Sequence, residues 1–254
     1  MTYYTGMIAA IPTAKRQAYI DHLRRAWHLL HKHGASRMVE GWGVDVPTGK
    51  VTDLRAAVQA RADETVIFNW IEWPDRATSD AAWVAMPGDP DMAALDKDMP
   101  FDGKRLIQGG FEPLMEAGTV HGAPYYQGFL LAVPEQNKAA YDKMARDAWP
   151  MFEKYGCLGI AENWGVDVPH GKLTDMYRAT KAEPGEVAVF SWTAWPDRAT
   201  CDRASQQMMS DMQGQPMPEM PFDGMRMMWG GFQTIFDSAE DGTYRDADPA
   251  ARAD

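Results

Sequence analysis

The chain has little cysteine and no long apolar run. Its only cysteines, Cys157 and Cys201, are too few for a disulfide framework, which is typical of a protein in a reducing compartment. No window approaches the roughly 18 uninterrupted apolar residues of a membrane span. The N-terminal sequence also lacks the basic segment and the small-residue cleavage site of a secretory signal. We therefore expect a soluble, cytoplasmic protein that does not enter a membrane.

Basic residues are also in deficit. Lys plus Arg is 25 and Asp plus Glu is 36, so the net charge is −11. This charge repels the phosphate backbone of nucleic acids, and no cluster of Lys and Arg interleaved with aromatic residues offsets it. We expect negligible nucleic-acid binding. The 254 residues, 45% of them hydrophobic, are enough for two domains with separate cores.

What the chain does have is an internal repeat. EGWGVDVPTGKVTD at 40–53 matches ENWGVDVPHGKLTD at 162–175, and WPDRAT occurs at both 73–78 and 195–200. Matches of this length indicate the duplication of one unit. The predicted divisions are a first repeat at 1–116, a linker at 117–124, a second repeat at 125–237 and an acidic flexible tail at 238–254.

Each copy alternates between strand and helix patterns. Short apolar runs at 3–11 and 125–133 predict buried strands. Each run is followed by apolar residues at helical spacing that end at Gly34 and Gly156. A second strand, a third strand, a helix after Trp-Pro-Asp and a fourth strand then follow in both copies.

The order strand, helix, strand, strand, helix, strand is the ferredoxin-like plan, in which both helices cover one face of an antiparallel sheet. The other sheet face is left bare, and a tandem copy supplies a partner for it at high effective concentration. We therefore predict an α+β fold in which two tandem ferredoxin-like units form an intramolecular, pseudo-dimeric α+β barrel. A further homodimer of the fused unit stays open.

The repeated motifs resemble those of one family. Both copies carry E-x-W-G-x-D-V-P-x-G-K-x-T-D, then W-x-x-W-P, M-P-F-D-G and R-x-x-x-G-G-F. This combination resembles the uncharacterised YbaA-like family within the dimeric α+β barrel superfamily, over nearly the whole of both copies. The resemblance implies the fold but no reaction. The wider superfamily includes cofactor-independent monooxygenases, isomerases, haem enzymes and ligand-sensing domains.

Several familiar kinds of catalytic or metal site are absent from the sequence or have residues in one repeat only. We therefore expect no cofactor and no metal. No Gly-x-Ser-x-Gly elbow is present, and GVDVPTGK at 43–50 lacks the spacing of a phosphate-binding loop. The histidines in or beside the first helix have no counterparts in the second copy, so only an asymmetric site at His28 and His31 stays open. Eight of the 18 methionines lie at 208–228, where they suit adaptable packing, a plastic pocket lining or, alternatively, Cu(I).

Polar residues present in both copies are the candidates for a site. Glu40 and Glu162 lie on the bulkier faces of the second strands, and we expect these faces to point into the barrel. The two glutamates are the candidate catalytic residues. Barrel closure predicts that Glu40 meets Arg226 and that Glu162 meets Arg105. Each pair is either a structural ion pair or a site in which Glu is an acid or base and Arg holds an anionic substrate. The predicted ligand-binding residues are both arginines and four tryptophans of the repeated motifs: Trp42, Trp164, Trp70 and Trp192.

The sequence favours a small-molecule binding protein or a cofactor-independent enzyme, of the oxygenase or isomerase kind, that uses a cavity between the two repeats. The alternative is a non-catalytic stress or interaction protein whose barrel is filled by side chains. The volume of the pocket separates these hypotheses. An opening of roughly a few hundred Å³ beside Glu40 or Glu162 favours the first.

Overall fold

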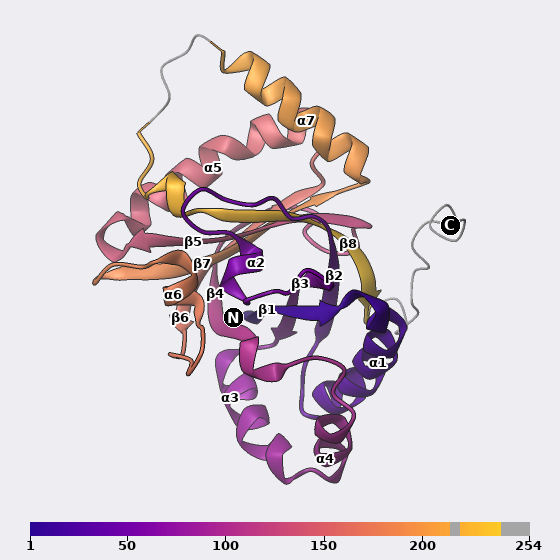
Figure 1. Cartoon of the computed structure of the whole chain (residues 1–254). Coiled ribbons are helices and arrows are strands. Elements are labelled where there is room, and N and C mark those ends of the chain that lie inside the picture. Colours follow the sequence, from indigo (N-terminus) through magenta and orange to yellow (C-terminus); the bar gives the residue numbers. More distant parts are fainter. Residues whose placement is uncertain (214–218, 240–254) are drawn as a thin grey trace.

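Eight strands close into one barrel in the computed structural model, which describes residues 1–213 and 219–239 (Figure 1). Most of the predicted acidic tail, from residue 240 on, lies outside the described residues. The strands of the first repeat are β1 (Tyr3–Pro12), β2 (Arg37–Asp45), β3 (Glu64–Trp73) and β4 (Ile107–Gly118). Those of the second repeat are β5 (Tyr125–Pro134), β6 (Gly159–Asp167), β7 (Glu186–Trp195) and β8 (Met228–Asp237).

Each repeat forms one antiparallel sheet, and the two sheets join at their edges. The strand order around the barrel is β1-β3-β2-β8-β5-β7-β6-β4. β2 therefore pairs with β8 and β4 pairs with β6, so the second strand of one copy lies beside the fourth strand of the other. These two seams confirm the predicted barrel of two ferredoxin-like units. β4 extends to Gly118, so the connection between the repeats is shorter than the predicted linker.

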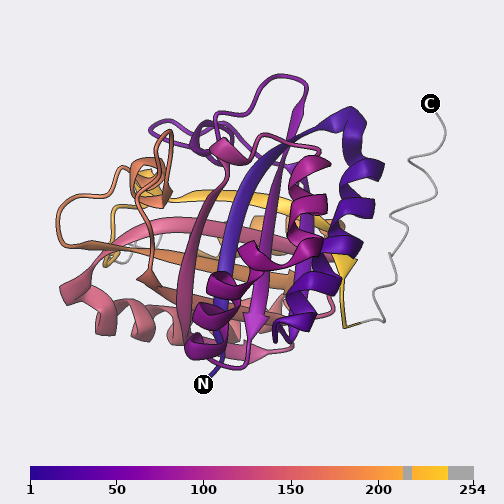
Figure 2. The same cartoon turned by 90° about the horizontal axis from the view of Figure 1, so that it is seen from below.

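Helices cover the outer surface of the barrel (Figures 1 and 2). The first repeat has α1 (Arg16–Lys32), α3 (Arg76–Ala85) and α4 (Pro90–Lys97), and the second has α5 (Lys138–Lys154) and α7 (Arg198–Asp211). Two short helices, α2 (Leu54–Ala57) and α6 (Met176–Thr180), contact each other at one end of the barrel. None of the helices in the described ranges combines the length and the apolar character needed to cross a bilayer.

Local sequence determines where several of these helices begin and end. The side chains of Asp75 and Asp197 accept hydrogen bonds from the backbone N–H of Thr78 and Thr200, which satisfies an otherwise unpaired donor at the start of α3 and of α7. Gly34 follows α1 with a φ of +100°, a conformation that glycine adopts without strain. The predicted caps are therefore confirmed at these positions.

Aromatic rings fill the barrel interior. Phe68 stacks on its counterpart Phe190 with ring centroids 4.1 Å apart, and Trp70 stacks on its counterpart Trp192 at 4.2 Å. A Cβ atom at Gly6 would lie 2.9 Å from the Phe190 ring, so the missing side chain provides the space for this stack. Because equivalent residues of the two copies meet, the rings mark the pseudo-two-fold axis and bury the sheet faces that the helices leave bare.

Candidate functional site

The predicted catalytic carboxyl groups of Glu40 and Glu162 lie on the outer face of the sheet, beneath the helices. The neighbours of Glu40 on this face belong to the core between sheet and helices, whereas Val39 belongs to the barrel interior. The prediction that the bulkier face of the strand points into the barrel is therefore wrong. The inner face is the smaller one because Gly41 leaves room for Phe232, whose Cβ would lie 2.7 Å from a Cβ at position 41.

The predicted Glu–Arg pairs across the seams are wrong as well. Arg105 donates to both carboxylate oxygens of Glu64 at 2.7 Å and also to Asp102. Arg226 makes the equivalent bidentate contact with Glu186. Each pair lies within one repeat and ties the start of the third strand to the turn before the fourth. Arg105 lowers the pKa of Glu64 to about 2, and with these partners neither arginine is available to hold an anionic substrate.

Glu40 instead lies among uncharged partners. Tyr19 of α1 donates to one carboxyl oxygen at 2.9 Å, and Asn69 of β3 donates to the other at 2.6 Å. All three side chains are buried. Burial raises the pKa of Glu40 to about 8, although both hydrogen bonds act in the opposite direction. This carboxyl group therefore carries a proton at neutral pH and releases it slightly above.

The second repeat keeps the tyrosine and the carboxyl group. Tyr141 donates to Glu162 at 2.6 Å, and burial again raises the pKa of the carboxyl group. The main difference is Ser191, which occupies the position of Asn69 and donates to Glu162. Sequence reasoning missed the tyrosines as partners of the glutamates. The signal was a tyrosine 21 residues before the glutamate in both copies.

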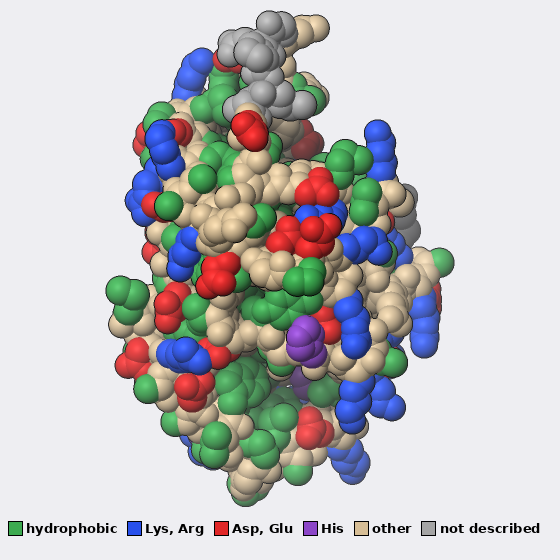
Figure 3. Space-filling view, turned by 90° about the vertical axis from the view of Figure 1, so that its left-hand side faces the viewer, with side chains coloured by type: hydrophobic (Ala, Val, Ile, Leu, Met, Phe, Trp, Pro, Cys, Tyr) green, Lys and Arg blue, Asp and Glu red, His purple; other side chains and the backbone are tan. Residues whose placement is uncertain are grey.

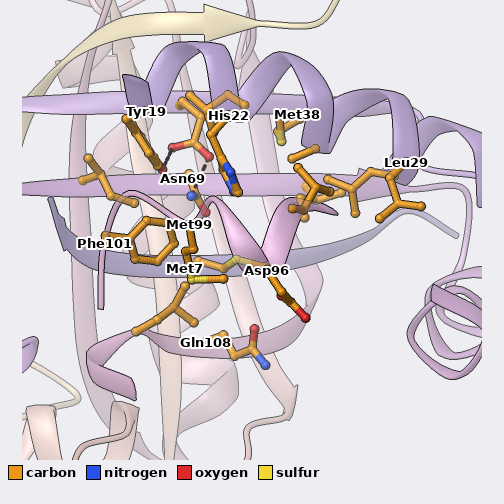
Figure 4. Close-up of a pocket in the computed structure, with 18 of the residues that line it drawn as sticks. Met7, Tyr19, His22, Leu29, Met38, Asn69, Asp96, Met99, Phe101 and Gln108 are labelled. Atoms are coloured by element: carbon orange, nitrogen blue, oxygen red, sulfur yellow. Dashed lines mark hydrogen bonds between the residues drawn. The ribbon is translucent and has the colours of Figure 1, made fainter. Parts of the chain in front are cut away.

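A cavity of about 230 Å³ lies beside Glu40, between the sheet and the helices of the first repeat (Figure 4). Its walls come from α1, α3, α4, the turn before β4 and the outer face of the sheet. In the space-filling view, hydrophobic side chains gather around a hollow in the lower half of the molecule (Figure 3). Most of the lining is apolar, and five of the lining residues are methionines: Met7, Met38, Met86, Met92 and Met99.

This cavity is a feature of the first repeat. Larger side chains occupy three of the matching positions in the second repeat, namely Phe129 for Met7, Phe152 for Leu30 and Trp229 for Gln108. Helix α4, which forms part of the wall, has no counterpart in the parts of the second repeat that the structure describes. The methionines that line the cavity are therefore not those of the predicted cluster at 208–228, part of which lies outside the described residues.

Helix α4 is held over the cavity by charged contacts with α1. Lys32 and His33 both lie beside Asp89 at the start of α4, at 2.7 and 2.9 Å. Arg25 lies 3.2 Å from Asp98 just beyond its end. These contacts join two elements that both line the cavity, so they position its wall.

The four predicted tryptophans do not line this cavity: Trp42, Trp164, Trp70 and Trp192. The last two stack on each other in the barrel interior. Trp42 lies beneath the guanidinium group of Arg16, with 5.7 Å between its ring centroid and the Cζ atom. Lys138 lies 4.9 Å from the ring of Trp164 in the same way. These cation–π contacts fix the starts of α1 and α5 on the sheet.

His22 is the histidine that reaches the cavity, and the sequence did not single it out. Its side chain is buried, and burial and then the nearby Arg25 lower its pKa, so the ring is uncharged at neutral pH. The ring atom Nδ1 has no hydrogen-bond partner, and neither has Oδ1 of Asn69. His28 and His31 do not line this cavity. Within the described ranges, no group of three or more His, Cys, Asp or Glu side chains is placed to hold a metal ion.

The chain has the fold of a dimeric α+β barrel, in which two ferredoxin-like units close into one barrel. Solved structures of this fold include a candidate monooxygenase from Fusobacterium nucleatum subsp. nucleatum, with a TM-score of 0.51 and 8% identity over 93% of each chain. Another, a candidate monooxygenase from Lactobacillus acidophilus, has a TM-score of 0.51 and 9% identity over 92% of this chain and 93% of that one. At such low identity the likeness shows the fold alone.

The family follows from the sequence matches. The model of the DUF1428 family, proteins of unknown function, matches residues 2–103 and 124–224, so the chain belongs to this family in duplicate. The uncharacterized protein YbaA of Escherichia coli K12 is 49% identical over 114 residues, which are 44% of this chain and 97% of YbaA. One repeat thus corresponds to one YbaA chain, and the resemblance inferred from the motifs is confirmed.

Proposed function

We propose that this chain binds a small, mostly apolar molecule in the cavity beside Glu40 and that Glu40 exchanges a proton with it. The observation that carries the proposal is a buried carboxyl group, its pKa raised to about 8, in the wall of an otherwise apolar cavity. A group whose pKa lies near the working pH transfers protons effectively in both directions. The position differs from the one expected, because the cavity lies beneath the helices of one repeat and not between the two repeats.

The neighbours of Glu40 suit this role. When Glu40 takes a proton from the ligand, its charge disappears from a buried site. When Glu40 returns the proton, Tyr19 and Asn69 stabilise the carboxylate with the hydrogen bonds they already make. A proton removed from one atom of the ligand and returned to another shifts a double bond within the ligand. This isomerisation is balanced without an oxidant, so it fits a cofactor-independent enzyme.

The two carboxyl groups provide a matched test. Wild type, Glu40→Gln and Glu162→Gln are incubated with a small-metabolite extract and desalted, and the retained molecules are identified by mass spectrometry. Proton exchange is then followed in D₂O as deuterium incorporation into each retained molecule. We expect retention by all three proteins, and deuterium incorporation with wild type and Glu162→Gln only. Equal activity of both variants contradicts the assignment to Glu40, and wild type that retains nothing contradicts the binding function.

The ring-filled barrel favours a second candidate function. Stacked rings from both repeats occupy the barrel interior, as expected for a non-catalytic stress or interaction protein. In that case Glu40 carries out no chemistry. The same experiment separates the two candidates, because wild type then incorporates no deuterium into any molecule, whether or not it retains one.

A further inference from the structure

Two polar atoms in the cavity wall have no hydrogen-bond partner in the protein. They are Nδ1 of His22 on α1 and Oδ1 of Asn69 on β3. The side chains are 7% and 5% exposed, so bulk water does not replace the missing partners well. Figure 4 shows both side chains reaching into the space between α1 and the sheet. A buried polar group left unpaired is costly, and a ligand that pairs with both atoms removes that cost.

The chemistry of these atoms defines the group that complements them. The amide nitrogen of Asn69 donates to Glu40 at 2.6 Å, which leaves Oδ1, an atom that only accepts hydrogen bonds, facing the cavity. The ligand must therefore supply a donor. His22 is neutral, so its Nδ1 either donates or accepts, depending on the tautomer. A hydroxyl group donates one hydrogen bond and accepts others, and it therefore satisfies both side chains.

The rest of the wall restricts the ligand further. The lining includes the carboxyl groups of Glu40 and Asp96 but no Lys or Arg, so it offers no charge partner for a carboxylate or a phosphate. An apolar cavity of about 150 Å³ is large enough for benzene. The cavity of about 230 Å³ therefore has room for one ring with a short substituent. Five methionines in the wall adapt to such a ring and make favourable sulfur–aromatic contacts.

We propose that the ligand of this cavity is an uncharged molecule of about single-ring size with a hydroxyl group, which His22 and Asn69 bind next to Glu40. This inference rests on the proposed binding function and adds the chemical class of the ligand. His22 and Asn69 are the specificity-determining residues, and their counterparts in the second repeat are Met144 and Ser191. The repeat that lacks this pair also has larger side chains at three matching positions of the wall.

Benzyl alcohol and ethylbenzene test the inference, because they have nearly the same shape and differ by a hydroxyl in place of a methyl group. Their dissociation constants are measured by NMR titration for wild type and for the double variant His22→Met, Asn69→Ser. The new side chains are those that the second repeat already carries at these positions, and Met144→His with Ser191→Asn is the matched control. Benzoate is the charged probe.

We expect the double variant to shift the affinity ratio by roughly thirtyfold in favour of ethylbenzene, as the loss of two hydrogen bonds of average net strength predicts. The control variant leaves the ratio unchanged, and benzoate binds more weakly than benzyl alcohol. An unchanged ratio in a double variant that still binds both probes overturns the hydroxyl assignment but leaves the binding function standing. Wild type that binds neither probe at millimolar concentration overturns the ligand class, whereas the metabolite-retention experiment decides the binding function separately.

Discussion

The protonation of Glu40 makes folding stability depend on pH in a calculable way. Its pKa is about 8 in the folded chain, against 4.5 for an unperturbed glutamate. Between these values the folded chain holds a proton that the unfolded chain has released. The contribution of Glu40 to stability is therefore complete below pH 4.5 and is lost as the pH rises toward 8. One pKa unit corresponds to about 1.4 kcal/mol, so the loss between pH 5 and pH 9 is on the order of 4 kcal/mol.

Glu40→Gln removes this dependence, because a glutamine stays uncharged and still accepts the hydrogen bond of Tyr19. Urea unfolding of wild type and variant from pH 5 to pH 9 measures the difference in the free energy of unfolding. We expect a difference within about 1 kcal/mol at pH 5 and a variant more stable than wild type by roughly 3–4 kcal/mol at pH 9. A difference that does not change with pH refutes the reasoning, because Glu40 would then not hold a buried proton. Glu162→Gln should give a difference of the same sign.

Three further predictions concern the ion pair, the barrel and α4. Arg105→Met leaves Glu64 buried without its partner, so urea unfolding should show a loss of about 3–5 kcal/mol, and a loss below 1 kcal/mol contradicts a structural role. Gly6→Ala places a methyl group against Phe190, so thermal unfolding should show a decrease of about 1–3 kcal/mol in the free energy of unfolding. An unchanged free energy of unfolding means that the stacked rings are not closely packed against Gly6. Asp89→Asn keeps a capping side chain but loses the ion pair with Lys32 of α1, so NMR titration should show roughly two- to fivefold weaker binding of benzyl alcohol, and unchanged binding argues against α4 as a wall of the site.

The fold was predictable because its signals are repeated and local. Each copy carries its own strand and helix periods, and Asp75 and Asp197 mark the helix starts in both. The joining of second and fourth strands across the seams follows from closing a barrel out of two ferredoxin-like sheets. Such features do not depend on knowing which side chains meet in space.

The site was predictable only in part. Period two places Glu40 on the bulkier face of its strand, but it does not say whether that face meets the helices or the other sheet. The glycines decide the question, since Gly41 makes the inner face small enough for the rings of the partner repeat. Arg105 was assigned to the wrong carboxylate because its partner Glu64 is the first residue of β3, outside the repeated motifs on which the assignment was based.

The residue differences between the two repeats were visible in the sequence, but the sequence did not show that they leave a cavity in the first repeat. His22 has no histidine counterpart, and this difference counted against a symmetric site. A cavity forms, however, where side chains of several elements are collectively small, and no single position shows this. Met7, Leu30 and Gln108 belong to different elements, and each is replaced by a larger side chain in the second repeat.

The methionines allow the most direct test of the central claim, a small-molecule site beside Glu40 in the first repeat. The chain is labelled with ¹³C at the methionine methyl groups, its spectrum is assigned by single Met→Leu substitutions, and benzyl alcohol is added. We expect shifts of the five methyl signals of the cavity wall, Met7, Met38, Met86, Met92 and Met99, while the signals of Met208 and Met209 in the second repeat stay in place. Shifts confined to the second repeat, or five unmoved wall signals at saturating probe, contradict the claim.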